Sequence, residues 1–331
     1  MSREFYLHVG LQRCASTLIE NTFLAPGHDV SAALRGGGIL PLLDLHLHLR
    51  DHREDVHWTG EFVDQLRHRH LMPQTRDAAW RGFFLTEEGL SASWLAGGPG
   101  IDIKARAGHL AALLEDFEVR ILLLVRDQAS FVRSLYALHL QNGGTLGFAE
   151  FVGGIPLSAL DWLDIARTYQ GSFGQGNVHV IPYNAECYQL GTPPYPGFLS
   201  AIQGAMGISD PVEVPRNHLF NPSIKTNLLP LQLAANKVLA PPLARDVSSL
   251  LRSGVTEPVR VIQSVRQNRG REDAAAVRAA LAVEAVKQAT EEATPFSAEE
   301  QRAYLANFNA GNRDMFAQFM ADYDASAFLA A

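Results

Sequence analysis

Four short apolar runs, separated by helix-like segments, constrain the fold of this chain more than any other feature. The runs lie at residues 5–9 (FYLHV), 82–86 (GFFLT), 119–125 (VRILLLV) and 178–182 (VHVIP). Between and after them, segments such as 104–116, 130–141 and 160–173 carry apolar residues at helical spacing. Strands that alternate with helices predict a three-layer α/β fold, with a central parallel sheet of about four to five strands and helices on both faces.

The last part of the chain has a different character. From residue 228 to 331 the sequence is rich in Ala and helix-forming residues and contains no strand-like run. We therefore expect one domain over 1–331, with an α/β core at 1–227 and a mostly helical subdomain or cap at 228–331. No heptad or long apolar stripe indicates an interface, so the oligomeric state stays open.

Charge and hydropathy exclude some functions. A formal charge of −7 argues against a nucleic-acid-binding protein, because nucleic-acid affinity depends mainly on a broad basic surface. The apolar runs are far shorter than the roughly 20 residues that cross a membrane, so we expect no integral membrane segment. With no signal-peptide pattern and only two cysteines, Cys14 and Cys187, the chain fits a reducing cytoplasm.

A loop that can bind an anion follows the first apolar run. Residues 10–17 (GLQRCAST) lead from a strand into a helix, an arrangement that directs backbone N–H groups at one point. The loop is not a good Walker A motif, because Ala15, Ser16 and Thr17 stand where Gly, Lys and Ser or Thr are needed. Its cation, Arg13, comes earlier. Another nucleotide loop and a purely structural turn remain alternatives.

The segment LHVGLQRCASTLIENTFL resembles the 5'-phosphosulfate-binding loop of sulfotransferases that use 3'-phosphoadenosine-5'-phosphosulfate (PAPS). That loop has the approximate pattern h-h-G-x-x-[KR]-x-G-[ST]-[ST]-x-L, from which Ala15 departs by replacing a Gly. The resemblance implies a P-loop-like fold in which the core at 1–227 binds the nucleotide. It implies that the loop residues that bind PAPS are Gly10, Arg13, Cys14, Ala15, Ser16 and Thr17.

A second pattern addresses the 3'-phosphate that distinguishes PAPS from ATP. Arg126 ends the most apolar run, where open α/β sheets bind ligands, and its planar guanidinium suits a phosphate. Ser134 and Tyr136 complete a pattern similar to the family's second signature, and RDQASFVRSLYALHLQNGG is similar to its bacterial branch. The alternatives are an Arg paired with a carboxylate, and a Walker B strand whose Asp127 binds magnesium.

The reaction needs a stabiliser of the leaving group and a general base. Arg13 is the candidate for stabilising the bridging oxygen. Glu87 and Glu88 follow the second run in FFLTEEGLS, which resembles the S-S-E-x-L element of bacterial sulfotransferases and places Glu88 at the acidic position. A solvated acidic pair is the alternative for these two residues. By the family resemblance, no metal is required.

Histidines are the other candidate bases. Six histidines lie close together in the sequence, namely His46, His48, His52, His57, His68 and His70. Their spacing is a poor zinc signature, so we expect these side chains to lie at the surface. Further along, His139 lies one helical turn after Tyr136 and is a candidate for bordering an acceptor pocket. A looser resemblance in PRNHLFNPSI makes Arg216 a candidate nucleotide ligand.

Together these patterns predict a PAPS-dependent sulfotransferase that releases 3',5'-ADP. The acceptor is a hydroxyl or amine of a small molecule, a glycan or a lipid-like alcohol, and no motif identifies it. Two other functions remain open, an ATP- and magnesium-dependent P-loop kinase and a nucleotide-binding protein of the same fold that has lost the chemistry.

Overall fold

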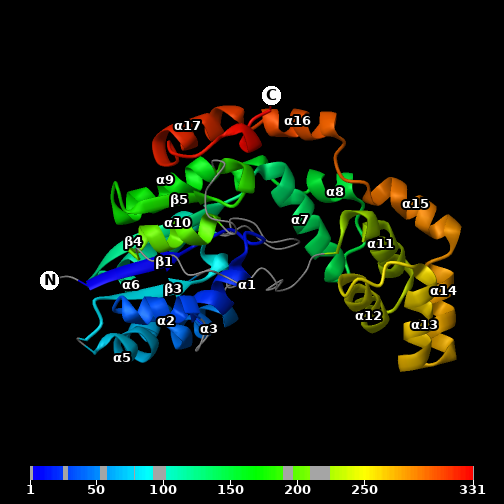
Figure 1. The fold of residues 1–331 in the computed structure, drawn as a ribbon, viewed down its shortest axis with the longest axis horizontal. Helices are drawn as coiled ribbons and strands as arrows, with labels where there is room; N and C mark the ends of the chain where they lie inside the picture. Colours follow the sequence, from blue (N-terminus) through cyan, green and yellow to red (C-terminus); the bar gives the residue numbers. More distant parts are fainter. Residues whose placement is uncertain are drawn as a thin grey trace. The chain divides into compact units, whose positions relative to one another are not determined.

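A five-stranded, all-parallel sheet forms the centre of the fold (Figure 1). The computed structural model of the chain describes residues 3–24, 29–52, 58–77, 79–91, 102–188, 197–208 and 224–330. The strands are β1 (Arg3–His8), β2 (Ile39–Pro41), β3 (Gly82–Thr86), β4 (Phe117–Val125) and β5 (Val178–Pro182). Their order in the sheet is β2-β3-β1-β4-β5. The predicted α/β class and the parallel sheet are therefore confirmed.

The four predicted strands are all present, whereas β2 was not predicted. It spans three residues and is followed directly by helix α3 (Leu43–Asp51). A run this short has no measurable two-residue periodicity, and its apolar residues merge with the leucines of the helix that follows. Pairing with β3, in which Leu40 is the partner of Phe83, makes these residues a strand.

The order of the strands creates a topological switch point beside β1. β1 pairs with β3 on one side and with β4 on the other. After β1 the chain continues to β2, on the β3 side, whereas after β4 it continues to β5, on the opposite side. In open α/β sheets, ligands bind outside the carboxyl ends of the strands at such a point. The residues that follow β1 and β4 therefore occupy the expected ligand position of this sheet.

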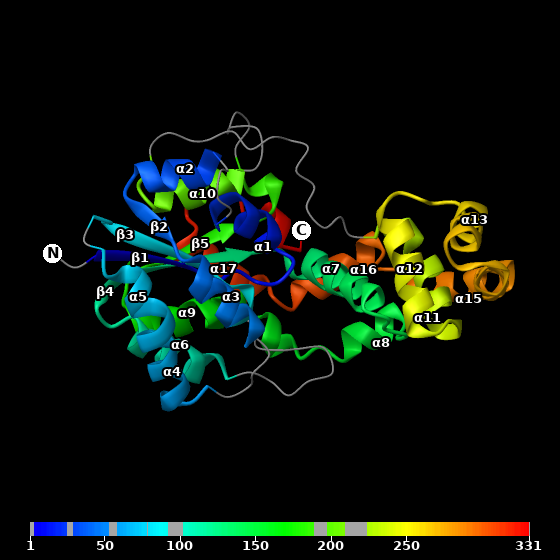
Figure 2. The same cartoon turned by 90° about the horizontal axis from the view of Figure 1, so that it is seen from below.

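Helices cover both faces of the sheet (Figure 2). α2 and α10 lie on one face, and α6 and α9 lie on the other. α9 packs against β4 and β5, α10 against β5 and α2 against β2. The helices and helical turns around the sheet are α1 (Ser16–Ile19), η1 (Glu20–Leu24), α2 (Asp29–Gly36), α3, α4 (Gly60–Leu66), η2 (Arg67–Leu71), α5 (Met72–Thr75), η3 (Glu88–Ser91), α6 (Ile103–Leu113), η4 (Leu157–Leu160), α9 (Trp162–Phe173), η5 (Ala185–Cys187), α10 (Gly197–Ala205), α17 (Asn309–Phe319) and η7 (Ser326–Phe328).

The chain divides into two compact units. The first contains the sheet and comprises Met1–Asp127, Leu157–Phe220 and Tyr304–Ala331, and the second comprises Gln128–Pro156 and Asn221–Ala303. The second unit is helical in the residues that the structure describes. Its helices are α7 (Gln128–Gln141), α8 (Phe148–Gly153), η6 (Thr226–Leu228), α11 (Leu229–Val238), α12 (Pro241–Arg252), α13 (Pro258–Arg269), α14 (Arg271–Ala280) and α15 (Val283–Ala293), and α16 (Ala298–Ala306) crosses its boundary.

Helix α7 ends where the Asn-Gly-Gly sequence predicts. Gly143 has a φ of 91°, its N–H donates to the Leu140 carbonyl, and the Gly144 N–H donates to the His139 carbonyl. These two bonds form a Schellman motif, which needs a left-handed residue and therefore favours glycine. The buried Asn236 of α11 donates to the carbonyls of Leu140 and Gly144, at 2.7 Å each, and so fastens this helix end within the second unit.

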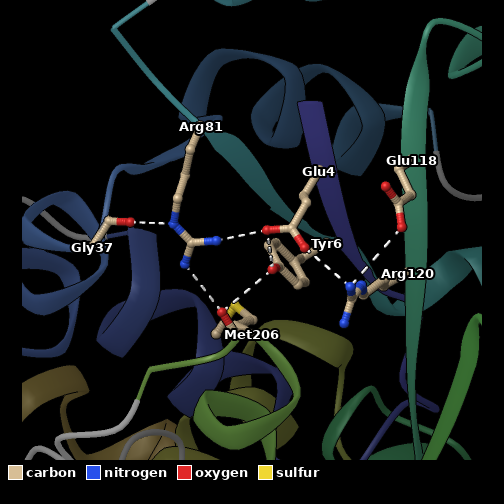
Figure 3. Close-up of polar contacts among 7 residues, drawn as sticks. All are labelled: Glu4, Tyr6, Gly37, Arg81, Glu118, Arg120 and Met206. Atoms are coloured by element: carbon tan, nitrogen blue, oxygen red, sulfur yellow. Dashed lines mark hydrogen bonds and ion pairs between the residues drawn. The ribbon is translucent and has the colours of Figure 1, made fainter. Parts of the chain in front are cut away.

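A charged network joins strands at the amino end of the sheet (Figure 3). Glu4 of β1 accepts a hydrogen bond from the Tyr6 hydroxyl at 2.7 Å and pairs with Arg81 at 2.6 Å and with Arg120 at 3.1 Å. Arg81 also donates to the Met206 carbonyl, which follows α10, at 3.2 Å. This network connects β1 and β4, the residue before β3 and the end of α10.

In the described part of the chain, no helix is long and apolar enough to span a membrane.

Candidate functional site

The loop after β1 is held to the sheet and then turns sharply. The Leu11 N–H donates to the Leu124 carbonyl of β4 at 3.3 Å, and the Cys14 N–H donates back to the Leu11 carbonyl at 3.2 Å. Helix α1 begins at Ser16, and its first helical bond runs from the Ile19 N–H to the Ala15 carbonyl at 3.0 Å. The loop predicted between a strand and a helix is therefore present at residues 10–15.

Two residues of this loop adopt the left-handed backbone conformation. Arg13 has a φ of 65° and Ala15 a φ of 62°, and they are the two non-glycine residues with positive φ in the described chain. For an L-residue this conformation costs roughly 1–2 kcal/mol. Ala15 stands where the resembling family has Gly, and it keeps the conformation that Gly favours. Turns with left-handed residues direct successive backbone N–H groups to one side, where anions bind.

Gly10 is required by its neighbours. A Cβ atom on Gly10 would lie 2.3 Å from Nε2 of His8 and 3.3 Å from Cβ of Leu124. His8 is fully buried, so its ring has little room to move aside. The glycine therefore lets the loop pass directly over the histidine ring at the end of β1.

Arg13, Glu88 and Arg126 come together at this edge of the sheet. The pKa of Arg13 is lowered mainly by its burial, raised by the charge of Glu88 and lowered again by the charge of Arg126. Both arginines and Glu88 also act on the buried Cys14, which lies between Arg13 and Ala15. Arg13 and Arg126, which are more than a hundred positions apart in the sequence, thus lie within electrostatic range of each other. An anion between their two guanidinium groups would be stabilised by both.

Arg126 is held by aromatic side chains of the sheet unit. Its guanidinium carbon lies 5.3 Å from the centre of the Tyr183 ring, and its carbonyl accepts a hydrogen bond from Trp162 Nε1 at 2.8 Å. Among the described residues, this side chain and its carbonyl contact the rings of Tyr183 and Trp162. Cation–π contact keeps the planar guanidinium in place.

Asp127 is engaged with the neighbouring strand. Its backbone N–H donates to Asn184 Oδ1 at 3.0 Å, and its Oδ2 accepts from Asn184 Nδ2 at 2.9 Å. Asn184 lies two residues after β5, so this paired contact fastens the end of β4 to the segment beyond β5.

Glu87 and Glu88 have different surroundings. β3 ends at Thr86 and Glu88 opens the short helix η3, so both acids lie beyond the strand. The Glu87 carboxylate is buried, accepts a hydrogen bond from the Gly89 N–H at 3.0 Å and lies 3.8 Å from His46. Glu88 is partly exposed and acts on Arg13. Of the two acids, Glu88 is therefore the one that shares the surroundings of the loop.

The other predicted ligands are distributed as follows. Burial raises the pKa of the Cys14 thiol to about 12, so the thiol is neutral. The charged part of an anion site would therefore come from other residues, and Cys14 could contribute only its backbone. Ser16 and Thr17 open α1. Ser134 lies on α7, in the second unit. Arg216 lies outside the described residues.

The predicted surface histidines are only partly at the surface. His46 is buried, and its Nδ1 lies 2.6 Å from the Thr86 carbonyl, which corrects the expectation for this residue. His48 stacks on His70 at 4.0 Å between ring centres and lies 4.7 Å from His52. In the described ranges, no group of three or more His, Cys, Asp or Glu side chains could hold a metal ion.

His139 belongs to an aromatic cluster of the second unit. Its ring centre lies 5.0 Å from that of Phe151 and 6.3 Å from that of Tyr136. A Cβ on Gly144 would come within 2.1 Å of its Nε2, so the ring is packed directly against this glycine. Burial lowers the pKa of His139.

His8 and Thr86 are polar residues of this edge that the sequence analysis did not single out. Both are fully buried, and His8 Nδ1 lies 2.7 Å from Thr86 Oγ1. A signal was present, because each is a polar residue at the end of an otherwise apolar run. Its meaning depends on the two runs being neighbours in the sheet.

Comparison with known proteins adds no relative. A scan against protein-family models finds no match, and a search of curated proteins finds none either.

Proposed function

We propose that this chain binds PAPS and transfers its sulfuryl group to a hydroxyl or amine acceptor, releasing 3',5'-ADP. One observation carries the proposal. Two arginines, Arg13 and Arg126, lie within range of each other's charge beside a left-handed loop at the topological switch point of the sheet. Like charges repel, so this arrangement favours a ligand that brings several negative charges to the same place.

The sequence patterns make PAPS the best candidate for that ligand. Residues 7–24 resemble the loop that binds the 5'-phosphosulfate, and the segment from Arg126 to Tyr136 resembles the element that binds the 3'-phosphate. Arg126 directly follows β4, and its guanidinium carbon lies 5.3 Å from the centre of the Tyr183 ring. By the same resemblance Ser134 contributes a hydroxyl to the 3'-phosphate, and Arg216 contacts the nucleotide. These two assignments rest on the sequence alone.

The proposed reaction assigns a role to each central side chain. The acceptor oxygen attacks the sulfur, the S–O bond to the 5'-phosphate breaks, and the electron pair of that bond stays on the phosphate oxygen. Arg13 stabilises the negative charge that develops there. Glu88 takes the proton of the acceptor hydroxyl as the new S–O bond forms. The products are 3',5'-ADP and the sulfated acceptor.

Binding of 3',5'-ADP to an Arg126 variant tests the nucleotide assignment. We expect Arg126→Ala to weaken 3',5'-ADP about 10- to 100-fold, the range of a lost charge-assisted hydrogen bond, and to leave 5'-AMP almost unchanged. Isothermal titration calorimetry with both nucleotides measures this. The matched control is Arg120→Ala, on the same strand but at the amino end, which should bind both nucleotides as the wild type does. Equal losses for 3',5'-ADP and 5'-AMP would sink the proposal.

Turnover assays separate the proposed enzyme from its two alternatives. Labelled PAPS and a broad acceptor panel should give a sulfated product that Glu88→Gln and Arg13→Ala each reduce strongly. Magnesium-dependent ATP turnover without any response to PAPS would instead establish a kinase. Tight 3',5'-ADP binding without transfer to any acceptor would indicate a nucleotide-binding protein that lacks the chemistry.

A further inference from the structure

A chain of buried hydrogen bonds joins the phosphate loop to the segment that carries Glu88. His8 is the last residue of β1, and the loop begins two residues later at Gly10. Thr86 is the last residue of β3, and Glu88 follows two residues later. The two strand ends are direct partners in the register of the sheet.

Three hydrogen bonds make this connection. His8 Nδ1 lies 2.7 Å from Thr86 Oγ1, and the Thr86 carbonyl lies 2.6 Å from Nδ1 of His46, on helix α3. The Glu87 N–H also donates to the His8 carbonyl at 3.0 Å. Because His8 and Thr86 are fully buried and His46 almost so, water does not compete for these bonds.

The protonation of both histidines follows from their partners. The Thr86 carbonyl can only accept, so His46 carries its proton on Nδ1. The only partner of the Thr86 hydroxyl among the described residues is His8 Nδ1. In one arrangement the Thr86 hydroxyl donates to His8 Nδ1, and only the Nε2–H of His8 remains unpaired. In the other, His8 Nδ1–H donates to the hydroxyl oxygen, and both the hydroxyl hydrogen and His8 Nε2 remain unpaired. The first arrangement leaves fewer unmet groups and places the His8 proton on Nε2.

His8 also determines what can stand at the start of the loop. Its Nε2 occupies the position next to the Gly10 Cα where a side chain would begin. The Nδ1 edge of the histidine ring is thus hydrogen-bonded to Thr86 of β3. The opposite edge, which carries Nε2, packs against Gly10. A shift of the ring would change the loop and the Thr86 contact together.

We propose that His8, Thr86 and His46 form a positioning tie that sets the phosphate loop relative to Glu88. The tie acts through neutral hydrogen bonds between β1, β3 and α3, and it touches no substrate atom. Its role in catalysis rests on the function proposed above, in which the loop holds the sulfuryl donor and Glu88 takes the acceptor proton. The hydrogen bonds themselves can be tested without any ligand.

The decisive experiment compares Thr86→Val, Thr86→Ser and Thr75→Val by hydrogen–deuterium exchange of the ligand-free, full-length protein. Thr86→Val keeps the shape of the side chain and removes the hydroxyl, whereas Thr86→Ser keeps the hydroxyl. Thr75 is the matched control, since it is buried in the same unit and its hydroxyl donates to the Leu71 carbonyl at 3.0 Å, in α5 before β3. Peptides covering residues 8–18 and 86–91 report on the two segments that the tie joins.

We expect Thr86→Val to raise exchange in both segments roughly five- to tenfold, the factor that one lost buried hydrogen bond corresponds to. Thr86→Ser should restore the wild-type rates, and Thr75→Val should leave both segments unchanged. Raised exchange in only one segment, or the same exchange in Thr86→Val and Thr75→Val, would overturn the tie. Should Thr86→Val fail to fold, a wild-type ¹⁵N spectrum decides: a hydrogen-bonded His8 Nδ1 supports the tie, and a His8 Nδ1 without a hydrogen bond overturns it.

A binding measurement keeps this proposal separate from the proposed function. The Kd for 3',5'-ADP should rise about five- to tenfold in Thr86→Val and return with Thr86→Ser. If the wild type fails to bind 3',5'-ADP, the proposed function is wrong, while the exchange data still decide the tie. If it binds and Thr86→Val binds equally well, the loop does not depend on Thr86 and the positioning proposal is overturned.

Discussion

The two ends of the central strands carry the same kinds of charged residue and use them differently. At the amino end, Arg81 and Arg120 share the carboxylate of Glu4 in direct contact (Figure 3). At the carboxyl end, the charges of Arg13 and Arg126 oppose each other, and Arg126 lies over the aromatic ring of Tyr183.

The difference separates a stabilising network from the proposed binding site. At the amino end, the arginine charges are already paired with Glu4, so this network stabilises the sheet and does not favour binding of an anion. Like charges that face one place make the folded state more stable when an anion binds there. The carboxyl end also contains the strained residues of the described chain, Arg13 and Ala15, and such strain is concentrated at functional sites.

The largest effect should come from removing the fit between Gly10 and His8. A Cβ at position 10 would overlap the His8 ring, so we expect Gly10→Ala to lower the free energy of unfolding by about 2–3 kcal/mol and to abolish 3',5'-ADP binding. Urea unfolding and calorimetry measure the two effects. The control is Gly108→Ala in helix α6, where nothing lies within 4 Å and the change should stabilise by about 0.5–1 kcal/mol. Wild-type stability in Gly10→Ala would show that the His8 ring can move aside, and that the carboxyl end is not packed as closely as the Gly10–His8 contact indicates.

Acid should lower the stability of the protein through the buried His8 at the carboxyl end. Burial lowers the pKa of His8 to about 3, whereas an unfolded histidine titrates near 6.5. Between these values the unfolded chain binds a proton that the native His8 does not, so stability is fully present above pH 6.5 and falls as the pH falls. For His8 alone we expect a loss of about 2 kcal/mol between pH 6.5 and 5.

Urea unfolding at several pH values measures this slope. Burial lowers the pKa of His46, His139 and His179 as well, so their contributions have the same sign. His8→Gln should remove the His8 share of the slope and keep the remainder. A free energy of unfolding that is constant from pH 7.5 to 5 would contradict the neutral, buried state of His8.

A smaller effect is expected from the amino end. Glu4→Gln removes the charge that two arginines share, and we expect it to lower the free energy of unfolding by about 1–2 kcal/mol, limited by the solvent exposure of Arg81 and Arg120. Binding of 3',5'-ADP should not change. Glu118→Gln is the control, because that carboxylate is more exposed and lies 4.0 Å from Arg120. Weaker nucleotide binding in Glu4→Gln would mean that the two ends are coupled.

The smallest effect should come from relaxing the loop. Ala15 has a φ of 62°, and glycine adopts this conformation without a steric cost, so Ala15→Gly should stabilise the protein by about 1 kcal/mol or less. Ala111→Gly, in the regular helix α6, should instead destabilise by a similar amount. Thermal unfolding of the two variants in opposite directions would confirm the left-handed conformation, and destabilisation by both would refute it.

Much of the fold could be predicted because its signals are local. Runs such as 121–125 (ILLLV) are apolar over their whole length, as a fully buried strand requires, and the Asn-Gly-Gly sequence ends α7 through the backbone freedom of Gly143. β2 could not be predicted, because three residues become a strand only through pairing with β3. The different surroundings of Glu87 and Glu88 could not be predicted either, because they arise where β3 ends at Thr86 and the chain turns into η3.

The amino-acid sequence by itself determined the α/β class, the position of the loop after the first strand and the candidates Arg13, Glu88 and Arg126. Only the tertiary structure decided which of these residues meet, how Ala15 replaces a glycine and what lies beneath the loop. The reason is physical: periodicity and turn chemistry act between neighbours in the chain, whereas His8 and Thr86 are 78 residues apart and become partners only when β1 pairs with β3.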